Sequence, residues 1–218
     1  MNRLLMAFCA MLASSAFAQD FVSVAPGAKV LKDDGKIRII EFQARAGLKI
    51  PLHSHPTMVV YLVKGGGVRF TSQDGKTVES NAATGAALIN APVTHSQEHI
   101  ADSHAILVEI AEGATFPPAP SGPDLFAVGA KHVKLLKEND RIRVYEYTAK
   151  KGDKVAMHSH PAHVVYLLDA GQTQFTLADG SKPKPGQVKD GDALINAPVT
   201  HAQEHLEDVR GIVIELKR

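Results

Sequence analysis

Histidines occur in this sequence at spacings that suit metal binding. Two pairs are each separated by one residue within segments rich in strand-forming side chains, and a further histidine follows each pair by about 40 residues. The six residues are His53, His55 and His95 in the first half, and His158, His160 and His201 in the second. Side chains two positions apart on a strand point to the same face, and neutral imidazole binds Zn, Cu, Fe and Ni. The spacing therefore predicts two metal sites, each with two histidines from one strand and one from a distant strand.

These histidines belong to an internal repeat. The string ALINAPVTH occupies residues 87–95 and returns letter for letter at residues 193–201. The segment His-Ser-His-Pro at residues 53–56 likewise returns at residues 158–161, and a Gln-Glu-His triplet at residues 97–99 returns at residues 203–205. Solenoids are built from shorter units in more copies. Two long copies therefore indicate two globular domains.

Short strands are the elements expected within each copy. Apolar and partly alternating runs at residues 37–42 and 142–147 favour strands, and Asp-Gly pairs at residues 74–75 and 179–180 are typical of hairpin turns. No convincing pattern for a long amphipathic helix is present. The fold class is therefore predicted as all-β, with one domain at residues 19–110, a proline-rich linker at residues 111–132 and a second domain at residues 133–218.

The first 18 residues are typical of a secretory signal peptide. Arg3 provides a positive start, residues 4–13 form an apolar stretch, and Ala16-Phe17-Ala18 fits the small-x-small pattern before a cleavage site. A retained membrane anchor is the alternative, but the apolar stretch is shorter than the roughly 20 residues that span a bilayer. We expect cleavage after Ala18, a periplasmic or secreted location, and no membrane attachment after cleavage. The only cysteine, Cys9, lies in this leader, so the mature chain has no disulfide.

The charge balance bears on the class of partner. The chain has 24 Lys and Arg against 23 Asp and Glu, a formal net charge of +1. Nucleic-acid-binding domains usually carry a basic surface, so no nucleic-acid partner is expected. A small molecule is the expected ligand, and assembly into a homo-oligomer stays open.

The histidine motifs resemble those of the cupin family. The first motif of that family reads G-x5-H-x-H-x3-E-x6-G. Its glycines and histidines match Gly47, His53, His55 and Gly66, and then Gly152, His158, His160 and Gly171. The second motif runs from a glycine to the third histidine, and here it is one residue shorter in both copies. The resemblance covers nearly all of the chain after the leader. It implies a bicupin, with two tandem cupin barrels of the double-stranded β-helix (jelly-roll) type.

One ligand position departs from the family pattern. The family's glutamate falls on Val59 and Val164, and valine cannot bind a metal. A fourth protein ligand is therefore not expected in either copy, and the open coordination positions would admit substrate, water or oxygen. Because three neutral imidazoles leave the charge of the metal undiminished, we expect an anionic ligand.

Further polar residues are predicted to line the pockets. They are Tyr61, Gln97 and His99 in the first copy, and Tyr166, Gln203 and His205 in the second. At about 3.3 Å per residue, the two histidines of this group are too far along their strands to join the metal ligands. Strand alternation places His163, which replaces Met58 of the first copy, at the surface. His104 and His132 are expected in solvent.

The sequence leaves several functions open. The resemblance implies a metal-dependent oxidoreductase of the dioxygenase type, a lyase or an isomerase, and no catalytic residue is assigned. The alternative is a non-catalytic cupin that binds a small ligand or a metal, and a third interpretation is a structural barrel with vestigial sites. The expected cofactor is a divalent transition metal, and the residues do not distinguish Fe, Mn, Zn, Cu and Ni.

Overall fold

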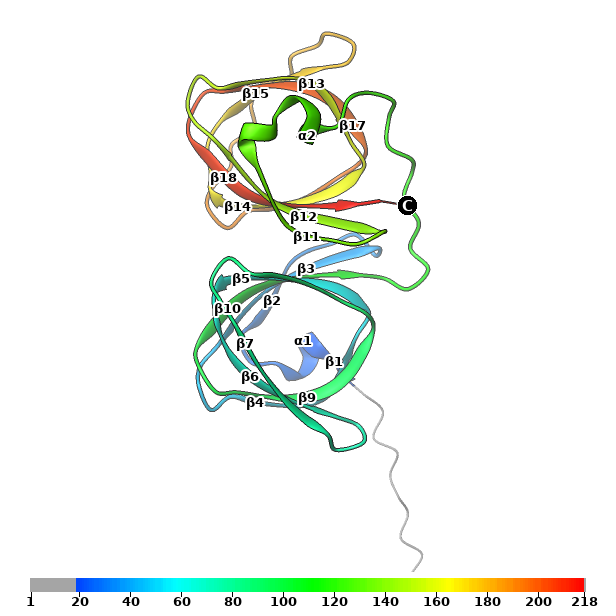
Figure 1. Ribbon diagram of the computed structural model, residues 1–218, viewed down its shortest axis with the longest axis vertical. Coiled ribbons are helices and arrows are strands. Elements are labelled where there is room, and N and C mark those ends of the chain that lie inside the picture. The colour runs from blue at the N-terminus through cyan, green and yellow to red at the C-terminus, as the bar shows by residue number, and fades with distance from the viewer. Residues whose placement is uncertain (1–18, 218) are drawn as a thin grey trace, which may run out of the picture.

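A computed structural model describes residues 19–217, and its regular structure is almost entirely β (Figure 1). Its four sheets form two barrels, one above the other in Figure 1. The predicted all-β class with two tandem barrels is therefore confirmed. The signal peptide predicted at residues 1–18 lies outside the described residues. Among residues 19–217, no helix has the length and apolar character needed to cross a membrane.

Two five-stranded sheets make up the first barrel. One contains, in spatial order, β1 (Gln19–Asp20), β4 (Lys49–His55), β9 (Val93–His99), β6 (Gly66–Ser72) and β7 (Thr77–Ala82). The other contains β2 (Ala28–Asp33), β3 (Ile37–Ala44), β10 (Ser103–Ile110), β5 (Thr57–Lys64) and β8 (Ala87–Asn90).

The second barrel repeats this order with a smaller outer sheet. Its five-stranded sheet contains β11 (Val133–Glu138), β12 (Ile142–Ala149), β18 (Val209–Leu216), β14 (Ala162–Asp169) and β16 (Ala193–Asn196). Its three-stranded sheet contains β13 (Lys154–His160), β17 (Val199–His205) and β15 (Thr173–Leu177). The internal repeat thus appears in the structure as two barrels of the same topology.

An apolar layer joins the two barrels. The sheet with β3, β10 and β5 faces the sheet with β12, β18 and β14, and alternate side chains of both sheets form one buried cluster (Figure 1). We call this cluster the inter-barrel layer; its residues include Ile37, Ile39, Val59, Tyr61, Ile142, Val144, Val164 and Tyr166. The intervening side chains of the same strands point into the barrels, so each of these sheets is buried on both faces.

A short helical turn lies near the start of each half of the chain. These turns are α1 (Phe21–Val24) and α2 (Leu125–Val128), the latter followed by a 3₁₀ turn, η1 (Ala130–His132). In Figure 1 each of the two α-turns is seen within the outline of its barrel. Asp124 caps α2 by accepting a hydrogen bond from the Phe126 amide, and Leu125 is buried in the interior of the second barrel. The predicted linker at residues 111–132 therefore ends in a segment that packs as part of the second barrel.

A proline between adjacent strands changes which alternate side chains point into the barrel. In β4 the odd-numbered His53 and His55 point into the barrel, but in β5 the even-numbered Met58 and Val60 do so. The change occurs at Pro56, which lies between the two strands and has no amide proton for the ladder. Pro161 has the same place between β13 and β14. Alternation therefore cannot be extended from the histidine pairs into the following strand.

Candidate metal centres

Paired strands bring the three predicted histidines of each barrel together. In the first barrel β4 carries His53 and His55, and its register places His53 opposite His95 of β9. In the second barrel β13 and β17 place His158 opposite His201 in the same way. One ring nitrogen from each histidine lies within 4.8 Å of the other two in both groups, and all six side chains are buried.

Backbone carbonyls orient the first histidine of each group. The Nδ1 atom of His53 lies 2.7 Å from the carbonyl oxygen of Pro51, and that of His158 lies 2.7 Å from the carbonyl oxygen of Ala156. A carbonyl only accepts, so Nδ1 donates and Nε2 keeps its lone pair. Both Nε2 atoms are buried without a hydrogen-bond partner. Such unpaired buried acceptors are uncommon in a folded protein and fit the binding of a cation.

A buried glutamate orients the second histidine. Nδ1 of His55 donates to Glu109 over 2.7 Å, and the same carboxylate accepts from Arg38 over 2.6 and 2.8 Å. In the second barrel Nδ1 of His160 donates to Glu215 over 2.8 Å. A carboxylate that accepts from Nδ1 fixes the tautomer in which Nε2 has a free lone pair. It also makes the imidazole a better metal ligand.

The second glutamate has an additional donor. Tyr145 donates its hydroxyl hydrogen to Glu215 over 3.2 Å, and Arg143 lies 3.4 Å from the same carboxylate. Both glutamates are nearly inaccessible to solvent. The sequence analysis did not identify them, although a glutamate recurs at the same position in the otherwise apolar last strand of both copies.

The third histidine of each group is held neutral. Burial, followed by the proximity of His53 and His55, lowers the pKa of His95 to about 4. Burial and the neighbouring histidines lower the pKa of His201 to about 3. Because only unprotonated imidazole binds a metal, these shifts keep the ligand atoms available near neutral pH. The donor sets of both barrels therefore fit a divalent transition metal, whose identity three imidazoles do not select.

Each metal centre opens into a cavity inside its barrel. The first cavity has a volume of about 780 Å³, and the side chains around His95 include Phe21, Phe42, Met58 and Phe70. The second has a volume of about 710 Å³ and replaces three of these with Leu125, Tyr147 and His163. Volumes of this size suit a small molecule. The two ligand triads are alike, but the walls around them differ.

Four of the six predicted pocket residues line these cavities. Gln97 and His99 lie in the first cavity, with their Nε2 atoms 3.0 Å apart. Gln203 and His205 lie in the second, and both hydrogen-bond to the hydroxyl of Tyr147, over 2.8 and 2.7 Å. The amide nitrogen of Gln203 also lies 3.3 Å from Nε2 of His201, so this side chain contacts the ligand triad without belonging to it.

The prediction was wrong for the two tyrosines. Tyr61 and Tyr166 lie in the inter-barrel layer instead of the cavities. Val59 and Val164 also lie in that layer, so they do not occupy a ligand position beside the histidines. The change of direction at Pro56 and Pro161 explains both errors, because the expected orientation was carried across these residues.

Three isolated histidines also differ from their predicted exposure. His163 is buried, its ring 4.9 Å from that of His160, because Pro161 turns it into the cavity. His132 is buried in η1, with Nδ1 3.0 Å from the carbonyl oxygen of Thr148. His104 is partly exposed and lies 3.0 Å from Glu41.

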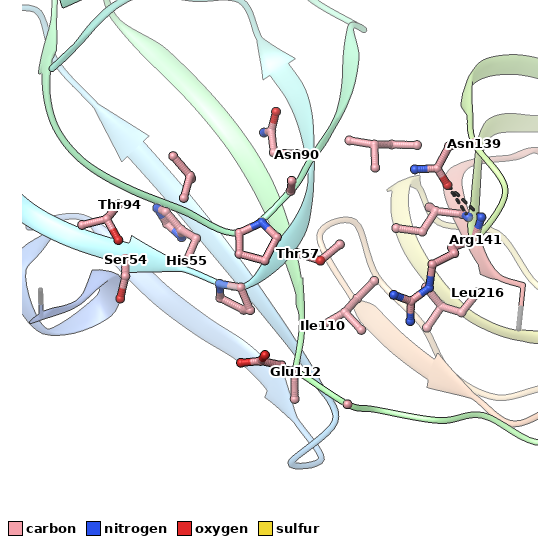
Figure 2. Close-up of a pocket in the computed structure, with 18 of the residues that line it drawn as sticks. Ser54, His55, Thr57, Asn90, Thr94, Ile110, Glu112, Asn139, Arg141 and Leu216 are labelled. Atoms are coloured by element: carbon pink, nitrogen blue, oxygen red, sulfur yellow. Dashed lines mark hydrogen bonds between the residues drawn. The ribbon is translucent and has the colours of Figure 1, made fainter. Parts of the chain in front are cut away.

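A cleft of about 1200 Å³ lies between the barrels and adjoins the first cavity (Figure 2). His55 and residues 90–94 line both spaces, so the cleft leads to the mouth of the first barrel. Figure 2 shows Glu112 on one side of the cleft and Arg141 of the second barrel on the other. The cleft therefore offers a route for small molecules and contains charges of both signs.

Solved structures with the same fold are cupin proteins. Oxalate decarboxylase from Bacillus subtilis, described with Mn(II) centres, matches with a TM-score of 0.62 and 13% identity over 89% of this chain and 74% of its own. A salicylate 1,2-dioxygenase mutant from Pseudoaminobacter salicylatoxidans matches with a TM-score of 0.54 and 11% identity over 86% and 75%. No family model and no curated protein matches the sequence. Since the identities are low, these similarities establish the fold alone.

Proposed function

We propose that this two-barrel cupin protein binds one divalent transition-metal ion in each barrel and there binds or transforms a small anionic molecule. The observation that carries the proposal is the convergence of three buried imidazoles, two of them with Nδ1 anchored so that Nε2 faces its partners. A metal held in this way supplies Lewis acidity or a centre for oxygen binding. Three protein ligands leave room for a small molecule beside it.

The surrounding residues have separate roles. Glu109 and Glu215 hold the tautomer and direction of the second histidine. Phe21 packs against the rings of His53 and His55, with centroids 5.1 and 4.8 Å away, and limits the access of water to that side. Such apolar walls lower the local dielectric and strengthen the interaction of an anion with the centre.

Charge favours an anion at each centre. An imidazole that binds a metal is neutral, so the charge of the metal itself would attract an anion. Arg38 pairs with both Glu109 and Asp20. The names of the similar proteins contain oxalate and salicylate, which are both small carboxylates. The cleft has both Glu112 and Arg141, so selection for an anion rests on the metal centre. An oxidoreductase, a lyase and an isomerase all fit such a centre, and a non-catalytic binding protein is the second candidate.

We further propose that the protein acts outside the cytoplasm. The motif in residues 1–18 supports this proposal. Expression of the full chain, fractionation of the cells and N-terminal sequencing test the idea. We expect the periplasmic or secreted form to begin at Gln19; a cytoplasmic protein that keeps Met1 would contradict export.

Elemental analysis of the purified protein is the first test of the metal sites. We expect about two transition-metal ions per chain, removable with a chelator and accompanied by a fall in the melting temperature. Metal-loaded and metal-free protein are then compared on a panel of small carboxylates, by calorimetry for binding and by product analysis for turnover. Binding without turnover would favour the non-catalytic function. The absence of bound metal and of any metal-dependent melting shift would contradict the proposal.

A further inference from the structure

One wall residue differs in chemistry between the two centres. The second residue of β5 is Met58, and the second residue of β14 is His163. Met58 pairs with Glu109 and Asn90, and His163 pairs with the corresponding Glu215 and Asn196. The two residues therefore occupy equivalent positions with equivalent strand partners. Both line the cavity of their barrel.

The tautomer of His163 follows from its single hydrogen bond. Its Nδ1 atom lies 2.9 Å from the carbonyl oxygen of Pro161, which only accepts. Nδ1 therefore carries the hydrogen, and Nε2 has a lone pair. With its hydrogen on Nδ1, the ring offers Nε2 as its acceptor in the second cavity.

The free nitrogen of His163 is directed at the cavity. Nε2 has no hydrogen-bond partner among the described residues and is not one of the fully enclosed unsatisfied atoms. The ring lies against that of His160, with centroids 4.9 Å apart. It is nevertheless outside the group of three nitrogens that lie within 4.8 Å of one another. His163 thus presents an acceptor beside the metal centre without belonging to its ligand triad.

Met58 cannot replace this acceptor. A thioether sulfur is a weak acceptor. Asn90, the strand partner of Met58, has its counterpart in Asn196 beside His163, so the imidazole nitrogen is the polar group that differs. A ligand that places a hydroxyl or N–H group at this wall would lose its hydrogen bonds to water in the first barrel. In the second barrel it would gain a bond to His163.

We propose that His163 gives the second barrel a ligand preference that the first barrel lacks. The second barrel takes a small anion that also bears a hydroxyl or N–H group, which donates to Nε2 of His163. The first barrel takes an anion without such a group. This inference rests on the proposed function, because it requires the anion to bind at the metal centre.

A matched pair of acids tests the preference. 3-Hydroxybenzoate and benzoate differ by one hydroxyl group, which lies too far from the carboxylate to bind the same metal ion. Their binding to metal-loaded protein is measured by calorimetry. In the wild type we expect about one site per chain to prefer 3-hydroxybenzoate, by roughly three- to tenfold, the value of one net hydrogen bond. His163→Met should leave no such site. Met58→His should create a second such site, in the first barrel. Pro56 lies two residues before position 58, as Pro161 lies two residues before His163, so its carbonyl can accept from Nδ1 in the same way.

Metal content and circular dichroism of each variant separate the outcomes. The inference requires His163→Met to keep two metal ions per chain and the wild-type fold. If metal binds but His163→Met retains the 3-hydroxybenzoate preference, the role of His163 is wrong. If His163→Met loses one metal ion, the residue is a metal ligand and the inference is also wrong. If the wild type binds neither metal nor acid, the proposed function itself fails.

Discussion

The carboxylate of Glu109 lies 2.7 Å from Nδ1 of His55, and each side chain is only 2% exposed. The pair connects the metal centre of the first barrel to the last strand of the same barrel. Arg38, one strand further, completes the contact from the other side of the carboxylate. The direction of one ligand thus depends on three strands, β4, β10 and β3, whose order the internal repeat preserves in the second barrel.

Replacing Glu109 with glutamine should weaken metal binding in the first barrel. The amide keeps the shape of the side chain but removes the charge that supports His55 and pairs with Arg38. Loss of such a partner typically reduces metal affinity by about 10- to 100-fold. Competition with a chelator should show one weakened and one unchanged site. Glu98→Gln, on the partly exposed rim, is the matched control, and equal affinities for both variants would contradict this role of Glu109.

Placing a glutamate at position 59 should destabilise the protein without improving the metal site. Val59 is fully buried in the inter-barrel layer, where a carboxylate has no partner. We expect Val59→Glu to lower the free energy of unfolding by about 3–5 kcal/mol, as seen for uncompensated buried charges. Urea unfolding measures the loss. Val30→Glu, at a position 39% exposed, is the control. Tighter metal binding by Val59→Glu would show that position 59 reaches the centre.

The two ligand triads should bind metal independently. Replacing His53 and His55 with alanine should remove about half of the metal, and replacing His158 and His160 should remove the other half. The reason is that each triad is complete within one barrel. Elemental analysis after gel filtration gives the count, and His104→Ala, a histidine outside both triads, should keep all of it. If one pair of substitutions removes all the metal, the other barrel has only a structural role.

Local patterns were enough to predict the triads. The His-x-His pairs lie within single strands, where alternation holds, and the repeated string around His95 identified the third ligand. The two barrels followed from the same repeat. Predictions of this kind succeed because each depends on a short segment whose geometry is fixed by strand pairing.

Predictions that extended strand alternation past a proline were wrong. Tyr61 and His163 were assigned by strand alternation from the histidine pairs, and Val59 by its match to the family's glutamate. Pro56 and Pro161 change which side chains point into the barrel. The sequence did not identify the buried glutamates, for a different reason. A charged residue in a strand usually faces solvent, and only the tertiary pairing of β10 with β3 brings Arg38 beside Glu109.

Acid should destabilise the metal-free protein well before its carboxylates titrate. The folded-state pKa values of His95 and His163 are about 4 and that of His201 is about 3, whereas an unfolded histidine titrates near 6.5. Between these values the unfolded chain binds protons that the folded chain does not. The free energy of unfolding therefore falls as the pH drops below about 6.5 and is insensitive to these groups above it. Each histidine contributes a slope of about 1.4 kcal/mol per pH unit.

Urea unfolding of metal-free protein between pH 7.5 and 5 measures this slope, and His163→Met provides the comparison. The variant removes one of the buried imidazoles, so its stability should fall less steeply by about 1.4 kcal/mol per pH unit below 6.5. Above pH 7 the two curves should run parallel. Bound metal should raise the whole curve at neutral pH, because it binds only the folded, unprotonated triads. Equal stability at pH 7.5 and 5 would mean that these histidines are hydrated in the folded protein, and the buried environment described for them would then be wrong.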